Sequence, residues 1–238
     1  MLMGRIHRYR TALSRRHRSG GFGIHSPFAF NFVLNVLRER RPYYAYDELM
    51  RLRSHAAQRA KSLPRHQGVI SFKSAKMLFR ITNYFQPSSI LHVGLNYGVA
   101  TAATLLPCSR STSVNHAPQS SRLPVAQEVL QAFEQRITFS PNLADAIDRY
   151  AQLAAGIPFI VVSRIDSEND LNTLIPFIDG ALQGEAVIII RIVSGKFLKK
   201  LWEHTKNQLQ HGHTYTNEKL AVVVSRPALP LQHFLLWF

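Results

Sequence analysis

Apolar side chains in the first third of the chain recur at helical spacing, which predicts three amphipathic helices. The pair Ser26-Pro27 is a typical helix start, because a hydroxyl can cap the first turn and proline fits within it. A second helix is expected to begin near Asp47, and a third to end before Pro87. The apolar stripes comprise Phe28, Phe32, Val33, Val36 and Leu37 in the first helix, Leu49, Leu52 and Ala56 in the second, and Ala75, Met77, Leu78, Ile81, Tyr84 and Phe85 in the third.

From residue 88 onward, short apolar runs alternate with longer amphipathic segments. Short runs rich in Val, Ile and Phe, bounded by turn residues, are typical of buried parallel strands. We expect strands at residues 90–93, 111–115, 137–139, 159–162 and 186–192, and helices at residues 98–106, 125–133, 144–153, 171–182 and 196–209. This alternation predicts an α/β fold in which right-handed crossovers cover both faces of a mostly parallel sheet.

Two more strands are expected after the last helix. Residues 220–224 and 232–237 are apolar runs joined by a proline-containing connection, so they are expected to pair as a terminal hairpin. The segment before them, with His211 and His213 around a glycine, is interpreted as a solvated turn. The predicted organisation is a basic arm (1–20), a helical extension (21–87) and an α/β domain (88–238).

The segment from Ser88 to Thr101 reads as a buried strand, a glycine-spaced turn and a helix start. Gly94 and Gly98 can adopt backbone angles closed to other residues, and the helix start would present free N–H groups to a carboxylate or phosphate. An ordinary tight turn would show the same spacing. Asn96 stands where the dinucleotide fingerprint has its second glycine, which disfavours a nicotinamide or flavin cofactor.

This segment resembles motif I of class I S-adenosylmethionine-dependent methyltransferases, in particular the small bacterial O-methyltransferase-like group. The runs Gly21–Phe28 and Tyr43–Asp47 and the closing Gln-His-Phe-Leu-Leu-Trp-Phe extend the resemblance over most of the chain. It implies a Rossmann-like, seven-stranded sheet of order 3-2-1-4-5-7-6, with the last strand antiparallel between the fifth and sixth. It also implies S-adenosylmethionine as cofactor, held by His92, Gly94, Leu95, Asn96, Tyr97, Gly98 and Asn115.

The chain departs from that group at its acidic positions. His92 and Asn115 stand where the group carries the acids of motif I and of the second strand, which implies that cofactor binding is weak or lost. The fourth strand ends in Ser163 and Arg164, and the fifth in Ile190 and Arg191, where the group carries metal-binding acids. Because a hard divalent cation requires several oxygen ligands, no metal is expected. The acids Asp166, Glu168 and Asp170 are interpreted as a helix-capping loop rather than a substitute metal site, and His25 and His116 as capping or turn residues that could instead act as a base.

The positive net charge of the chain favours an anionic binding partner. The chain carries a net charge of +15 and has a pI near 10.5, which favours nucleic acid or an anionic surface. No carboxylate occurs between Glu48 and Glu128 or before residue 19, and the arm contributes Arg5, Arg8, Arg10, Arg15, Arg16 and Arg18. The single Cys108 and the lack of a long apolar run lead us to expect a cytoplasmic protein without a transmembrane segment.

Three functions remain open at this point. The first is a metal-independent methyltransferase that acts on a small molecule, nucleic acid or protein. The second is a catalytically inactive relative whose basic arm contacts RNA, DNA or an anionic membrane surface. The third is a subunit of a larger assembly whose arm docks on a partner protein. Fold alone does not distinguish them.

Overall fold

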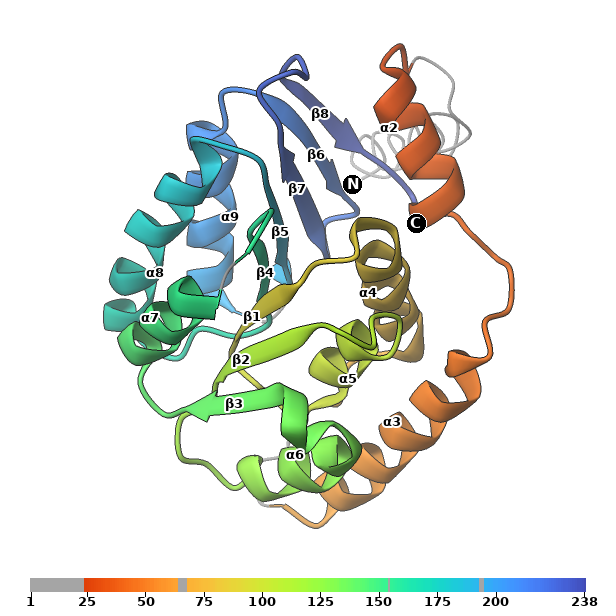
Figure 1. Ribbon diagram of the computed structural model, residues 1–238, viewed down its shortest axis with the longest axis vertical. Helices are drawn as coiled ribbons and strands as arrows, with labels where there is room; N and C mark the ends of the chain where they lie inside the picture. Colours follow the sequence, from red (N-terminus) through yellow and green to blue (C-terminus); the bar gives the residue numbers. More distant parts are fainter. Residues whose placement is uncertain (1–23, 64–67, 154, 193–194) are drawn as a thin grey trace, which may run out of the picture.

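The computed structural model describes residues 24–63, 68–153, 155–192 and 195–238. Within them, an eight-stranded sheet has helices on both faces (Figure 1). The strands are β1 (Ser89–Val93), β2 (Thr112–His116), β3 (Ile137–Ser140), β4 (Phe159–Val162), β5 (Ala186–Ile190), β6 (Gly212–Thr216), β7 (Ala221–Ser225) and β8 (Gln232–Leu235). The helices are α2 (Pro27–Phe32), which continues as the π-helix η1 (Val33–Leu37), α3 (Ala45–Lys61), α4 (Phe72–Phe85), α5 (Val99–Leu105), α6 (Leu123–Leu130), which continues as the 3-10 helix η2 (Gln131–Arg136), α7 (Leu143–Leu153), α8 (Glu168–Leu182) and α9 (Lys196–Gln208).

The sheet order is β3-β2-β1-β4-β5-β7-β6-β8. Strands β1 to β5 pair in parallel, and β7 runs antiparallel between β5 and β6. The predicted α/β Rossmann-like fold and the order 3-2-1-4-5-7-6 are confirmed, with β8 added beyond β6. The direction of winding reverses between β1 and β4, and ligands of open α/β sheets bind at the carboxyl ends of strands at such a point.

The two strands predicted near the end of the chain are present as β7 and β8, but their predicted positions in the sheet were wrong and β6 was not predicted. The supposed solvated turn at His211–His213 lies largely within β6, and the inserted antiparallel strand is Ala221–Ser225. Residues Gln232–Leu235 pair in parallel with β6 at the sheet edge instead of forming a hairpin with β7. The reason is burial: all five residues of β7 are buried, which suits an interior position, whereas the mixed β8 is only partly covered. Trp237 in the closing run is 61% exposed.

Two layers of helices cover the sheet. On one face, α7, α8 and α9 enclose a core of residues such as Leu91, Ile160 and Ile188 (Figure 1). On the other face, α4, α5 and α6 pack on residues such as Ile90 and Val161, and α3 lies against these three helices. The predicted helical extension therefore shares one core with the sheet.

Side-chain contacts fasten the helical extension to the rest of the molecule. Ser26 caps α2, as predicted, by accepting a hydrogen bond from the N–H of Ala29 at 3.3 Å. The buried Arg80 on α4 donates to the carbonyl oxygens of Val36 (2.7 Å) and Leu37 (3.1 Å), which end the π-helix. Because those carbonyls have no partner within the helix, Arg80 satisfies them and orients α2 over the sheet.

Strand β6 is covered by an aromatic cluster from distant parts of the chain. The ring of Tyr215 lies 4.9 Å from that of Phe32 and 5.3 Å from that of Phe234. His213 is fully buried beside Phe28, and its Nδ1 lies 3.0 Å from the hydroxyl of Tyr215. Burial lowers the pKa of His213 to about 4, so the imidazole is neutral near pH 7.

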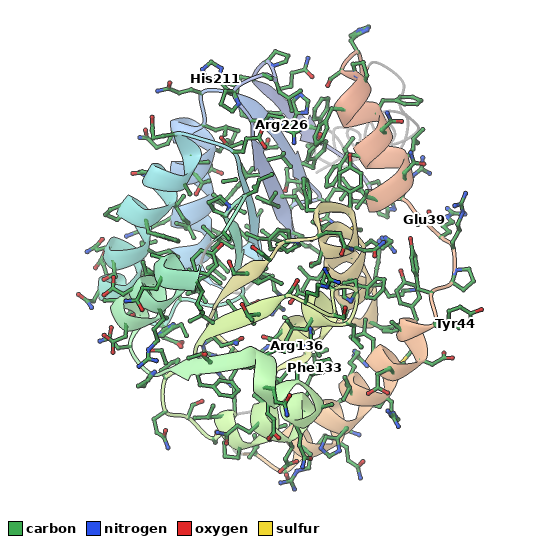
Figure 2. The ribbon with its side chains drawn as sticks, in the orientation of Figure 1. Glu39, Tyr44, Phe133, Arg136, His211 and Arg226 are labelled. Carbon is green, nitrogen blue, oxygen red and sulfur yellow. The ribbon has the colours of Figure 1, made fainter. Side chains whose placement is uncertain are left out.

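Charged groups lie on the outer surface of the helical layer that contains α3 and α6. Glu128 on α6 accepts hydrogen bonds from Arg59 at 2.8 and 2.9 Å, which links α3 to α6. In η2, Arg136 and Phe133 lie next to each other in Figure 2, with the guanidinium carbon 5.3 Å from the ring centroid. Tyr44, between η1 and α3, projects fully into solvent at the margin of the molecule (Figure 2).

No helix in the described ranges is long and apolar enough to cross a membrane. The predicted basic arm, with its six arginines, lies outside the described residues.

Candidate functional site

A cavity of about 570 Å³ opens at the carboxyl ends of β1, β2, β3 and β4. It lies at the point where the winding of the sheet reverses, and its volume suits a small organic ligand. The apolar part of its wall consists of Leu95, Ala117, Pro118, Leu123, Pro141, Leu143 and Ala144. The polar part comprises Asn96, His116, Gln119, Ser120, Ser121, Arg122, Asn142, Arg164, Asp166, Asn169, Asp170 and Thr173, with Gly94 at the base.

Gly94 is required by the close approach of two loops. Its φ is +78°, and a Cβ atom at this position would lie 2.4 Å from the carbonyl oxygen of Arg164. The two loops are also joined by the N–H of Ser163, which donates to the carbonyl of Val93 at 2.9 Å. The β1 loop is therefore fixed against the end of β4, and only glycine fits.

Of the seven predicted cofactor-binding residues, Gly94, Leu95 and Asn96 line this cavity. Asn96 has a left-handed backbone (φ +53°) and a buried Oδ1 atom without a hydrogen-bond partner among the described residues. A buried acceptor left without a partner costs stability unless a ligand or water satisfies it. Asn96 is therefore the residue of the motif I loop best suited to contact a ligand.

His92 lies inside the protein and not in the cavity wall. It is buried in β1, and its Nε2 lies 2.9 Å from the hydroxyl oxygen of Thr104. The hydroxyl of Thr104 donates its proton to the carbonyl of Thr101, so its oxygen accepts the hydrogen bond from His92. The imidazole of His92 therefore carries its proton on Nε2. Burial lowers the pKa of His92 to about 3, so it joins β1 to α5 as a neutral group.

Asn115 is likewise turned away from the cavity. Its Oδ1 accepts a hydrogen bond from the hydroxyl of Thr101 at 2.8 Å, and its Nδ2 donates to the hydroxyl of Ser113 at 3.0 Å. The fully buried Asn115 thus has partners on both atoms of its amide and fastens β2 to α5. It lies beside His92, its register partner in β1, but outside the cavity wall that contains Gly94, Leu95 and Asn96.

Tyr97 and Gly98 lie at the start of α5, outside the wall of the large cavity. Gly98 has φ +78°, and a Cβ there would lie 3.0 Å from the carbonyl oxygen of Ala126 and from Leu130, so this glycine allows α5 to pack on α6. Tyr97 is buried, with its hydroxyl without a partner among the described residues. Because α5 is only seven residues long and fully buried, we assign no anion site to its N-terminus.

The β2 residue that faces the cavity is His116. Strand β2 extends one residue beyond its predicted end, and alternation along a strand places His116 on the face opposite Asn115. Its Nδ1 is buried without a partner in the described part of the chain. Burial lowers the pKa of His116, and the nearby Asp170 and Asp166 oppose this shift. His116 therefore presents a neutral imidazole beside two carboxylates.

The acidic loop after β4 provides the carboxylates of the cavity. Ser167 caps α8 by accepting from the N–H of Asp170 at 3.0 Å, so the capping role is carried by a serine beside the predicted acids. Asp166 pairs with Arg164, and Glu168 pairs with Lys200 on α9. Asp166 and Asp170 both line the cavity, where they supply negative charge that β1 and β2 lack.

The described residues contain no group of three or more His, Cys, Asp or Glu side chains that could hold a metal ion. His25 is exposed next to the cap of α2 and lies outside the cavity wall. Sequence reasoning also missed the loops at Gln119–Arg122 and Pro141–Ala144, because nothing in their composition distinguishes them from ordinary connections.

No protein-family model matches this chain, and no curated protein matches it in sequence. Solved structures do match its fold. An O-methyltransferase from Bacillus cereus in complex with S-adenosylhomocysteine is 14% identical, with 82% of this chain and 96% of the other covered and a TM-score of 0.51. S-adenosylhomocysteine-bound methyltransferase PaMTH1 from Podospora anserina is 11% identical, with 85% and 97% covered and a TM-score of 0.55. The O-methyltransferase TomG from Streptomyces achromogenes, in complex with S-adenosylmethionine, is 13% identical, with 83% and 96% covered and a TM-score of 0.53.

These likenesses establish the fold. The chain has the class I S-adenosylmethionine-dependent methyltransferase fold, as the resemblance implied, over nearly the full length of the matched structures.

The polar atoms of the cavity fit the nucleoside part of S-adenosylmethionine. Apolar walls from Leu123, Pro141 and Leu143 suit a flat base, and the carboxylate of Asp170 suits ribose hydroxyls. The unpartnered Nδ1 of His116 adds a further hydrogen-bonding atom. The residues of this cavity that fit the cofactor therefore differ from the acids of the family pattern.

Proposed function

We propose that this protein binds S-adenosylmethionine in the cavity above β1, β2, β3 and β4 and acts as a metal-independent methyltransferase. The observation that carries the proposal is the pair of unpartnered buried atoms, Oδ1 of Asn96 and Nδ1 of His116, in a cavity of about 570 Å³. When bound, the cofactor supplies an electrophilic methyl group. The proposed compartment is the cytoplasm, in keeping with a single, buried Cys108.

The residues of the cavity have separate roles in this proposal. Asp170 accepts hydrogen bonds from the ribose hydroxyls, and His116 contacts the same part of the nucleoside through Nδ1. Asn96, which lines the cavity, accepts a hydrogen bond from the ammonium group of the methionine part. Gly94 keeps the loop closed against the end of β4.

Replacement of Asp170 by asparagine tests the proposal. Loss of a charge-assisted hydrogen bond should weaken S-adenosylmethionine binding by about tenfold, as measured by isothermal titration calorimetry. The matched control is Asp148→Asn, because Asp148 is exposed on α7 and lies outside the cavity wall. The proposal fails if the unmodified protein shows no binding at about 1 mM cofactor, or if both variants bind as the unmodified protein does.

A second proposal concerns the arm and belongs to the alternative function, a basic binding module. We infer that Arg5, Arg8, Arg10, Arg15, Arg16 and Arg18 contact the phosphates of single-stranded RNA. The observation that favours it is the density of positive charge in a segment without a carboxylate, interleaved with Tyr9, which can stack on a base.

Deletion of Met1–Arg18 tests this arm. If all six arginines contact phosphate, log affinity should fall against log salt with a slope of roughly −4, at about −0.7 per phosphate. The truncated protein should show a nearly flat slope in fluorescence anisotropy, with an unchanged melting temperature. Equal RNA binding by the truncated protein, or a much lower melting temperature, would contradict the assignment and indicate a protein partner or a role in the fold.

A further inference from the structure

A second cavity of about 570 Å³ lies where the start of α4 meets the end of β5 and the end of the chain. Its wall also includes the turn between β6 and β7. The residues that line it are Ser71, Lys73, Ser74, Met77, Arg191, Asn217, Glu218, Lys219, Leu220, Leu236, Trp237 and Phe238. We refer to it as the cationic pocket.

Positive charge dominates this pocket. Lys73, Arg191 and Lys219 line it, against one acidic side chain, Glu218. None of these three cations forms an ion pair with another residue of the described ranges. The three come from α4, β5 and the β6–β7 turn, so the tertiary fold gathers them and no local motif does.

The pKa values of Lys73 and Arg191 are both lowered in the folded protein. The pKa of Lys73 is lowered, first by burial and then by the nearby positive charges of Lys219 and Arg80. Burial also lowers the pKa of Arg191. Cations that lie near one another disfavour each other's charged form, and an anion that binds between them relieves this repulsion.

The remaining wall is apolar. Met77, Leu220, Leu236 and Phe238 are buried or nearly so, whereas Trp237 is 61% exposed beside the opening. A small inorganic ion would leave this apolar surface uncovered. The combination suits a ligand with an anionic group at one end and an apolar body at the other.

The cationic pocket adjoins the cavity proposed for the cofactor. A small gap between side chains, lined by Ile70, Asn96, Tyr97 and Arg191 and too small to hold a water molecule, lies between them. Asn96 belongs to the wall of the first cavity and Arg191 to the wall of the second. At the end of β5, where the family pattern places acids that hold a metal ion, this chain places a guanidinium that can hold an anion directly.

We propose that the cationic pocket binds an organic anion, a carboxylate or phosphate monoester on an apolar body, through Lys73, Arg191 and Lys219. That this anion is the methyl acceptor rests on the proposed function. Arg191 is the central residue, because it is the cation of the pocket that also lines the gap beside Asn96, and its planar fork can form two parallel hydrogen bonds with a carboxylate or phosphate.

Trp237 offers a direct readout of the pocket. The chain has two tryptophans, and the other, Trp202, is 7% exposed on the opposite face of the sheet. Hexanoate and hexyl phosphate, titrated at a constant ionic strength of about 0.15 M, should each change the emission of Trp237 in a saturable manner. The neutral hexanol and inorganic phosphate should give little change. The stronger of the two anions identifies the preferred group, and Trp237→Phe should remove the signal.

Two variants test the cations separately. Arg191→Met and Lys219→Met should each weaken binding of the preferred anion by about tenfold or more. Lys219 is exposed on a turn, so its replacement leaves the fold intact even if Arg191→Met does not fold. The matched controls Arg149→Met and Lys199→Met change exposed residues outside both cavities and should bind as the unmodified protein does.

The outcomes separate this inference from the proposed function. Anion binding that depends on Arg191 and Lys219, in a protein that does not bind S-adenosylmethionine, supports the pocket and removes only its link to methyl transfer. Cofactor binding with no saturable response of Trp237 to either anion overturns the pocket and leaves the proposed function in place. Equal binding by Lys219→Met and Lys199→Met also overturns it, because the anion would then bind elsewhere. Asp170→Asn should not alter anion binding.

Discussion

Replacement of Gly94 by alanine should lower the free energy of unfolding by about 4 kcal/mol. A left-handed backbone costs a non-glycine residue about 1–2 kcal/mol, and forced displacement of packed atoms costs about 1–3 kcal/mol more. The displacement is unavoidable here, because the new Cβ would lie 2.4 Å from the carbonyl oxygen and 2.8 Å from the Cα of Arg164, which are backbone atoms. Urea unfolding followed by circular dichroism measures the change.

Gly156→Ala is the matched control. Gly156 also has a positive φ, of +90°, but a Cβ at that position would meet no atom within 4 Å. The free energy of unfolding of this variant should fall only by the cost of the left-handed backbone, about 1 kcal/mol. Equal losses in the two variants would show that the contact between the β1 loop and Arg164 is not fixed in solution. A larger residue, such as aspartate, at position 94 would disturb the fold before it could report on cofactor binding.

The second large effect is a loss of stability as the pH falls from 6.5 toward 4. The pKa values of His92 and His213 are about 3 and about 4 in the folded protein, against 6.5 for the exposed group. In this range the unfolded chain binds protons that the folded protein does not, so acid favours unfolding. Each of the two histidines should reduce the free energy of unfolding by roughly 1.4 kcal/mol per pH unit.

Urea titrations at pH 7, 6 and 5 measure that slope. His213→Phe should reduce the slope by roughly 1.4 kcal/mol per pH unit, because the ring fits among Phe28, Tyr215 and Phe234 but binds no proton. The control is His211→Gln, since His211 is exposed at the edge of the molecule (Figure 2). A slope that His213→Phe leaves unchanged would mean that His213 is protonated within the folded protein.

The local pattern of apolar residues along the sequence predicted most of the fold. The runs at β4 and β5 are apolar along their whole length because both faces of these strands are buried, and the sequence alone reveals this. Strand β6 was missed because Gly212 and His213 resemble a turn. Its burial comes from Phe28 and Phe32, far away in the sequence, although the alternation of Thr214, Tyr215 and Thr216 with high strand propensity was a usable signal.

The site was less predictable, because a shift of one residue reverses the face of a strand. The sequence analysis ended β2 at Asn115, whereas β2 ends at His116, and that single position decides which side chain faces the cavity. From the sequence, His116 is expected to be a capping or turn residue that could instead act as a base. The cationic pocket could not be predicted, because it depends on the unforeseen β6–β7 turn lying beside the start of α4.

The aromatic contacts between α2 and β6 also affect how the protein forms during synthesis. Phe28 and Phe32 are made well before Tyr215, and contacts between residues so distant in the sequence form slowly. Tyr84 and Phe85 on α4 can contact this helix sooner. The side of α2 that faces β6 therefore stays uncovered until β6 has been made, and exposed apolar surface of this kind favours aggregation of a nascent chain.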